Sequence, residues 1–182
     1  MKATGIVRRI DDLGRVVVPK EIRRTLRIRE GDPLEIYTDR EGGIILKKYS
    51  PMGDLTQFSK QYAEALAQNT GYIVSITDRD QHIAVAGAGR KELMQKAISR
   101  QLDTLMNQRE ISQAVKGERR FIPITDGHGE NYTAQVICPI IADGDAIGAV
   151  ILTTKAEKAR MGELEMKLAA SAASFLGRQL EQ

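Results

Sequence analysis

The sequence is poor in metal-binding and redox-active side chains. It contains one cysteine, Cys138, and two histidines, His82 and His128. A single thiol cannot form an internal disulfide, and these three residues lack the paired spacing of zinc ligands. We therefore expect no structural metal, no catalytic metal and no cofactor.

Long hydrophobic runs are also missing. No apolar stretch approaches the roughly 18 to 20 residues that a membrane span needs, and residues 1–4 begin no signal-peptide segment. The sequence therefore predicts a cytoplasmic protein without a membrane segment.

No set of residues resembles a catalytic site. His82 falls in a predicted strand and His128 in a glycine-rich turn, which favours surface or hydrogen-bonded structural roles over general-base catalysis. The short glycine run at residues 86–90 lacks the spacing of nucleotide-binding loops. Cys138 precedes a proline in an apolar strand, which is typical of a small buried hydrophobic residue. The sequence predicts that the protein is not an enzyme.

The composition is that of a globular chain. Hydrophobic residues make up 42% of the sequence and charged residues 28%, without a low-complexity tract. The length of 182 residues exceeds that of one typical domain of about 100 to 150 residues. Pro51 and Gly53 interrupt any regular element. We expect one domain over residues 1–50, a linker at 51–53 and a second domain over 54–182.

Positive charge is concentrated in the first domain. Residues 1–50 hold 12 Lys and Arg against 8 Asp and Glu, and eight of the basic residues are arginines. The planar guanidinium group suits phosphate groups and guanine edges. A nucleic acid is the favoured partner, and a merely solvated basic surface is the alternative.

The N-terminal residues predict two hairpins separated by a short helix. β-Branched residues favour strands over Gly5–Asp11 and Arg15–Val18, with a turn between them. Pro19 has no backbone N–H to donate to a neighbouring strand, but it suits the first turn of a helix. A helix is therefore expected from residue 20. A second hairpin is predicted over residues 34–38 and 43–48.

The short helix is amphipathic. On a helical wheel, Arg23 and Arg24 lie opposite Ile22 and Leu26. Fifty residues of this kind bury too little surface to fold alone without metal or disulfides. We therefore expect a dimer that shares one core through residues 1–50.

The order of these features resembles a known family. Residues 5–26 read GIVRRIDDLGRVVVPKEIRRTL and residues 31–36 read GDPLEI. This closely resembles the swapped-hairpin, looped-hinge-helix DNA-binding domain of bacterial transition-state regulators of the AbrB class. The resemblance implies a dimer with interleaved hairpins that binds double-stranded DNA through Arg8, Arg15, Arg23 and Arg24. Lys20, Arg9 and Arg27 are secondary candidates.

The assignments of the four arginines as DNA contacts have different grounds. The helical wheel supports Arg23 and Arg24 independently of the resemblance. Arg8 shares a strand face with Ile6 and Ile10 by period-two alternation, so it rests on the resemblance alone.

The remaining residues predict an α+β domain with an antiparallel sheet. Helices are expected over residues 54–69, 91–107 and 158–180, and strands over 72–77, 82–86, 121–125, 132–141 and 146–154. The phrases VSITDRDQHIAVAG at 74–87 and CPIIADGDAIGAV at 138–150 are similar to GAF domains. The two resemblances in this order imply a two-domain, sporulation-type transcription regulator of spore-forming bacteria.

The role of the second domain stays open on sequence grounds. It could sense a small molecule in a cleft between the sheet and the helical face at Tyr62 or residues 93–105, near the turns 78–81 and 126–131. It could instead be a scaffold that joins two dimers into a tetramer through the long terminal helices. A third alternative is an antitoxin-like autorepressor whose C-terminal domain binds a protein partner.

Overall fold

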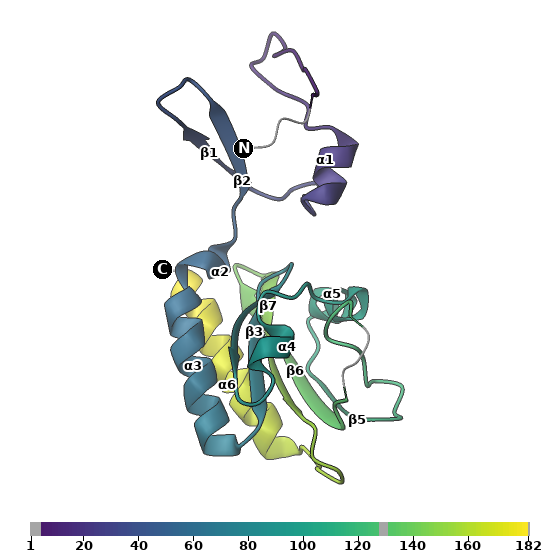
Figure 1. The fold of residues 1–182 in the computed structure, drawn as a ribbon. Helices are drawn as coiled ribbons and strands as arrows, with labels where there is room; N and C mark the ends of the chain where they lie inside the picture. The colour runs from purple at the N-terminus through teal and green to yellow at the C-terminus, as the bar shows by residue number, and fades with distance from the viewer. Residues whose placement is uncertain (1–4, 128–130, 182) are drawn as a thin grey trace. The chain divides into compact units, whose positions relative to one another are not determined.

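The computed structural model of the chain describes residues 5–127 and 131–181. The chain divides into an N-terminal unit, Met1–Tyr49, and a C-terminal unit, Ser50–Gln182 (Figure 1). Each unit is described by itself. Within the described part of the chain, no helix combines the length and the hydrophobicity needed to span a membrane.

The N-terminal unit contains a short helix and one hairpin. Helix α1 spans Lys20–Thr25 and follows Pro19, as predicted. Strands β1, Leu34–Thr38, and β2, Ile44–Lys48, pair antiparallel with Ile36 opposite Leu46, which confirms the second hairpin.

The first hairpin forms its turn but not its strands. Asp11 donates its N–H to the carbonyl oxygen of Arg15 at 3.0 Å, and Gly14 takes a φ of +77° that favours glycine. No strand forms over Gly5–Asp11 or Arg15–Val18, so both predictions are wrong for the single chain. A strand needs a neighbour for its backbone hydrogen bonds, and among the described residues of this chain none supplies it.

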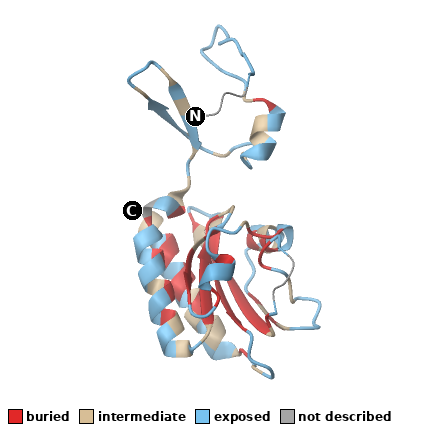
Figure 2. Ribbon diagram, in the orientation of Figure 1, coloured by how far each residue is buried: buried red, intermediate tan, exposed pale blue. Residues whose placement is uncertain are grey.

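The same segments leave apolar side chains exposed. Val7 is 86% exposed, Leu13 and Val17 are 70% exposed, and helix α1 buries no residue. Figure 2 shows the N-terminal unit largely in the colours of exposed and intermediate residues. Exposed apolar surface of this extent is typical of an interaction surface.

The C-terminal unit is a five-stranded antiparallel sheet between two layers of helices. Its helices are α2 (Pro51–Asp54), α3 (Thr56–Thr70), α4 (Arg90–Leu93), α5 (Arg100–Gln108) and α6 (Glu163–Leu180). Its strands are β3 (Ile73–Thr77), β4 (His82–Ala86), β5 (Ser112–Val115), β6 (Ala134–Ala142) and β7 (Asp145–Thr154), in the order β4-β3-β7-β6-β5.

Each face of the sheet has its own core. Val74 and Ile76 of β3 join the cluster under α3 and α6, whereas Ile73 joins the cluster with Leu102 and Met106 of α5. The alternation follows from the period of two along a strand. Figure 2 shows the buried residues concentrated on the sheet and on the sides of α3 and α6 that face it.

The single helix predicted over residues 91–107 is wrong, because α4 and α5 are separate. Between them Gln95 takes a φ of +61° and donates its N–H to the carbonyl oxygen of His82 at 2.9 Å. The connecting segment thus pairs with the strand beside it. Ser99 then starts α5 by accepting the N–H of Leu102 on its side-chain oxygen at 3.0 Å.

The strand predicted over residues 121–125 is also wrong. Thr125 pairs with Ile98 in an isolated bridge and not in a strand, and the strand beside β6 is β5, which sequence reasoning missed. The buried amide of Gln135, oriented to satisfy its neighbours, donates to the carbonyl oxygen of Ile122 and accepts its N–H, both at 2.9 Å. A side chain of β6 therefore replaces the strand neighbour that residue 122 lacks.

Two boundaries differ from the sequence prediction. Residues 51–53, expected as a linker, lie in α2, whose first residue Pro51 needs no backbone N–H and whose Met52 is fully buried. The terminal helix begins at Glu163 and not at residue 158. Its start is set by Gly162, whose N–H donates to the carboxylate of Glu165 at 2.6 Å.

Two residues weighed as catalytic candidates have structural surroundings. Cys138 is buried, and burial raises the pKa of its thiol to about 11. His82 is fully buried, with Nδ1 at 2.6 Å from the Ser75 hydroxyl and Nε2 at 3.2 Å from the carbonyl oxygen of Ile124. A carbonyl only accepts, so Nε2 carries the proton and Nδ1 accepts from Ser75. His128 lies outside the described residues.

This burial makes a pH-dependent stability prediction. Desolvation lowers the pKa of His82 from 6.5 to about 4. Between these values the unfolded chain binds a proton that the native chain does not, so stability falls as the pH drops from about 6.5 to about 4. Relative to His82→Asn, the wild-type free energy of unfolding should fall by about 3 kcal/mol over this range.

Urea unfolding of both proteins at several pH values measures the difference. The second histidine is present in both proteins, so its own titration cancels in the comparison. Parallel pH profiles for the two proteins would show that His82 does not resist protonation.

Candidate nucleic-acid interface

Arg15 is positioned by an acidic residue at the turn of the first hairpin. The Asp11 carboxylate accepts the backbone N–H of Leu13 at 3.1 Å, the N–H of Arg15 at 2.8 Å and the Nε of Arg15 at 2.8 Å. The hydrogen bonds from Arg15, backbone first and side chain second, lower the pKa of Asp11. The Arg15 side chain remains 69% exposed, so it is oriented while still open to a partner.

Arg23 and Arg24 lie in the last turn of α1 and have different surroundings. Arg23 is half-buried and donates its Nε to the carbonyl oxygen of Val18 at 3.2 Å. Arg24 is exposed. On the opposite side of the helix Ile22 is half-buried and Leu26 is 56% exposed, so the expected apolar face has no cover in the single chain. The amphipathic pattern is present, but its core is incomplete.

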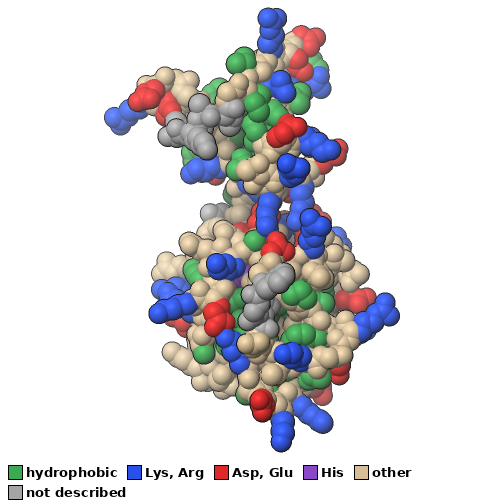
Figure 3. All heavy atoms as spheres, turned by 45° about the vertical axis from the view of Figure 1, so that its right-hand side comes forward, with side chains coloured by type: hydrophobic (Ala, Val, Ile, Leu, Met, Phe, Trp, Pro, Cys, Tyr) green, Lys and Arg blue, Asp and Glu red, His purple; other side chains and the backbone are tan. Residues whose placement is uncertain are grey.

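Arg8 belongs to the other arm of the first hairpin. It is exposed, and its Nη1 lies 3.5 Å from the carbonyl oxygen of Val7. The secondary candidates Arg9, Lys20 and Arg27 are exposed as well. Figure 3 shows Lys and Arg side chains beside hydrophobic side chains on the visible face of the N-terminal unit. Basic and apolar groups therefore share this surface.

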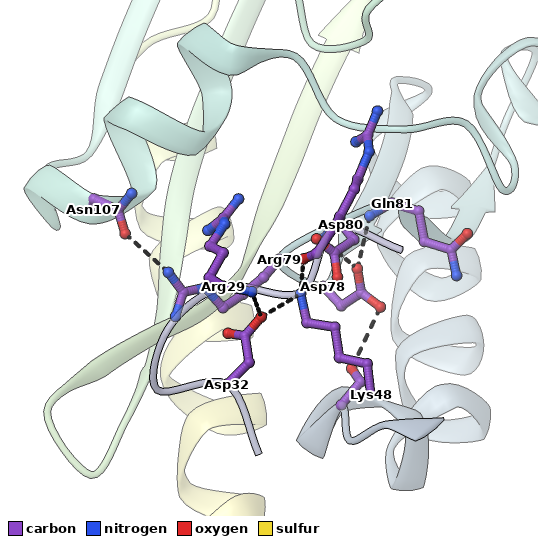
Figure 4. A network of polar contacts seen from close by, with 10 residues as sticks. Arg29, Asp32, Lys48, Asp78, Arg79, Asp80, Gln81 and Asn107 are labelled. Atoms are coloured by element: carbon purple, nitrogen blue, oxygen red, sulfur yellow. Dashed lines mark hydrogen bonds and ion pairs between the residues drawn. The ribbon is translucent and has the colours of Figure 1, made fainter. Parts of the chain in front are cut away.

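A second acidic residue fixes the loop after α1. Asp32 accepts the backbone N–H of Arg29 at 2.7 Å and pairs with the Nζ of Lys48 at 3.0 Å (Figure 4). The contact ties the loop between α1 and β1 to the end of β2. Sequence reasoning missed the anchoring roles of Asp11 and Asp32. For Asp32, which follows Gly31 in a turn, the aspartate next to glycine was a usable signal.

The C-terminal unit has a polar turn between β3 and β4. The Asp78 carboxylate accepts the N–H groups of Asp80 and Gln81, both at 2.7 Å, and lies 3.4 Å from the hydroxyl of Ser50 (Figure 4). Burial raises the pKa of Asp78. Arg79 reaches Asn107 of α5 at 3.4 Å. The turn therefore contacts both the segment before α2, through Ser50, and helix α5, through Asn107.

Two cavities lie beside helices of the C-terminal unit. The space between α5 and the sheet is filled by buried side chains that include Leu102, Met106 and Ile137. A cavity of about 310 Å³ borders Leu105, and another of about 450 Å³ borders Tyr62 between α3 and α6. Among residues 5–127 and 131–181, no group of three or more His, Cys, Asp and Glu side chains could hold a metal ion.

The fold of the C-terminal unit is that of GAF domains. It superimposes on the GAF domain of PixJ from Thermosynechococcus elongatus in its blue-light absorbing form with a TM-score of 0.57 at 15% identity, covering 74% of this chain and 89% of that one. The predicted GAF-like α+β fold is therefore confirmed.

The N-terminal unit matches two related groups. Over 51 residues the chain is 69% identical to transition state regulatory protein AbrB of Bacillus subtilis, which covers 28% of this chain and 52% of AbrB. Residues 7–54 match the family model of MazE, a bacterial antitoxin. These matches confirm the predicted swapped-hairpin domain.

Together the two domains define a bacterial transcription factor in which an AbrB-type domain precedes a GAF-like domain. Residues 54–181 match the family model of the stage V sporulation protein T C-terminal domain, described as a transcription factor. The whole chain is 53% identical over 182 residues to stage V sporulation protein T of Bacillus subtilis, with both chains fully covered. The chain therefore belongs to the stage V sporulation protein T family. The match to a transcription factor confirms that the protein is not an enzyme.

Proposed function

We propose that the protein regulates transcription of sporulation-type genes by binding double-stranded DNA as a dimer through residues 1–50. Arg8, Arg15, Arg23 and Arg24 of both chains would contact the phosphates. The observation that carries this proposal is the exposed basic surface of a unit whose sequence is 69% identical to AbrB over 51 residues. Such a surface makes few base contacts, so specificity would come largely from groove shape.

The salt dependence of DNA binding tests this proposal. Eight phosphate contacts per dimer give a slope of log K against log salt of roughly −7. Arg24→Ala removes two contacts per dimer and should shallow the slope by about 2 on every duplex. Arg24 is the cleaner choice because Arg23 also bonds to the backbone of Val18. Fluorescence anisotropy over a range of salt concentrations gives the slope.

Arg40→Ala is the matched control. Arg40 is an exposed arginine at the turn between β1 and β2, outside the proposed contact set. Its replacement should leave the slope unchanged. An unchanged slope for Arg24→Ala would show that Arg24 does not contact DNA phosphates and is only solvated.

We propose two roles for residues 54–182. The first is assembly of two dimers into a tetramer through α3 and α6, where Phe58 is 49% exposed, Phe175 is 39% exposed, and the rings of Tyr62 and Phe175 lie 5.5 Å apart. Exposed aromatic side chains on two adjacent helices support an interface. The second role is sensing of a small molecule, and the cavities beside the helices support it.

An antitoxin-like autorepressor is the alternative, and the MazE match over residues 7–54 is the observation that favours it. The match ends at residue 54, the last residue of α2. Residues 54–181 belong to a transcription-factor family, which favours the regulator.

A further inference from the structure

A cleft on the flank of α5 combines an apolar surface with open charges. Its volume is about 310 Å³, and α5, the beginning of β5 and the segment 120–122 form its walls. Leu105, Ile111 and Ile122 line it, and Ile111 is 44% exposed. Small-molecule sites occupy clefts of roughly this size and begin with such an apolar surface.

Two opposite charges border the cleft. Glu110 and Arg120 both line it, and neither takes part in an ion pair within the described part of the chain. Both residues are exposed, so both charges are accessible to a ligand in the cleft. The Ser112 hydroxyl adds a buried polar group to the lining.

The backbone at both charges is held in place. Glu110 follows Arg109, which ends α5 with a φ of +59°. Arg120 precedes the segment that Gln135 fixes, because the Gln135 amide makes two hydrogen bonds of 2.9 Å to the backbone of Ile122. The segment that follows Arg120 is therefore fixed to β6, which lowers the entropic cost of ordering that wall on binding.

We propose that this cleft binds a small zwitterion with an apolar side chain, namely a free aliphatic amino acid or a dipeptide of such residues. The carboxylate pairs with the guanidinium of Arg120, the ammonium pairs with Glu110, and the side chain covers Ile111 and Ile122. This inference rests on the proposed sensing role and names the ligand class.

The test uses the full-length protein and measures ligand Kd by calorimetry. The probes are L-leucine, leucyl-leucine, 4-methylpentanoate, which lacks the ammonium group, and isoamylamine, which lacks the carboxylate. At least one zwitterion should bind, and each half-charged analogue should bind about tenfold or more weakly. Whichever of L-leucine and leucyl-leucine has the lower Kd shows whether the ligand is a free amino acid or a dipeptide.

Variants of Glu110 and Arg120 test which charged group of the ligand each residue binds. Arg120→Gln should weaken the zwitterion and 4-methylpentanoate by about tenfold or more, whereas Glu110→Gln should weaken the zwitterion and leave 4-methylpentanoate unchanged. Arg119→Gln is the matched control, because Arg119 is exposed next to Arg120 and does not line the cleft. Absence of binding by both zwitterions, or binding that both variants leave unchanged, overturns the inference.

DNA affinity with and without ligand separates this inference from the sensing role. A zwitterion that binds as described but leaves DNA affinity unchanged supports the cleft and refutes sensing. If DNA affinity responds to a small molecule while Arg120→Gln and Glu110→Gln bind zwitterions as the wild type does, sensing stands and the cleft assignment is wrong.

Discussion

The substitution Val16→Asp is expected to abolish high-affinity DNA binding. Val16 is 50% exposed in the single chain and neighbours Arg15 on the same hairpin arm. If this arm forms a strand in the dimer, Val16 would point away from the proposed DNA face. In the interleaved dimer this side chain would be covered, and a buried unpaired carboxylate prevents assembly. Without the dimer, each chain presents only its own arginines to the DNA. DNA affinity should therefore fall by about a hundredfold or more.

Mass measurement distinguishes lost assembly from a local effect. By light scattering, the wild-type full chain should contain four copies and Val16→Asp two, because the proposed pairing through α3 and α6 would remain. Val16→Ile keeps a β-branched apolar side chain and should retain both mass and DNA binding. A Val16→Asp protein with wild-type mass would refute the interleaved dimer, and a wild-type protein of two copies would refute the tetramer.

Gly177→Ala is expected to destabilise the C-terminal unit by about 3 kcal/mol. A Cβ at Gly177 of α6 would lie 2.1 Å from the backbone carbonyl oxygen of Ile141 in β6. Neither backbone can yield easily, so the helix must move off the sheet and uncover neighbours such as Ala173 and Leu176. This cost exceeds the gain of about 1 kcal/mol that alanine usually brings to a helix.

Gly53→Ala is the control for this substitution. Gly53 lies in α2, and a Cβ there meets nothing within 4 Å. Urea unfolding followed by circular dichroism should show wild-type or slightly higher stability for Gly53→Ala. Equal stability of Gly177→Ala and wild type would mean that α6 can shift on the sheet without loss of packing.

Local patterns predicted those elements whose contacts are local. The helix after Pro19, the hairpin of β1 and β2, and the strands β3 and β4 depend on turns, proline and alternation within a few residues. The arms of the first hairpin have strand-like sequences but no ladder within their own chain. Propensity alone cannot show where a strand finds its neighbour.

The errors in the C-terminal unit arise from contacts between distant residues. The break between α4 and α5 depends on pairing with His82, and the failed strand at residues 121–125 depends on the amide of Gln135. Ser99 carried a helix-start signal that the apolar spacing around it obscured. For the candidate site, the wheel separated Arg24 from Leu26, while the orientation of Arg15 by Asp11 required coordinates.

The hairpin arms that lack a ladder within their own chain also bear on how subunits exchange. In an interleaved domain, two chains separate only when the bonds that hold each domain folded are broken. Subunit exchange would then proceed at the unfolding rate of the domain, which is slow for small stable folds. Chains synthesised together would stay together, so old and new protein would occupy DNA as distinct dimers long after synthesis had changed.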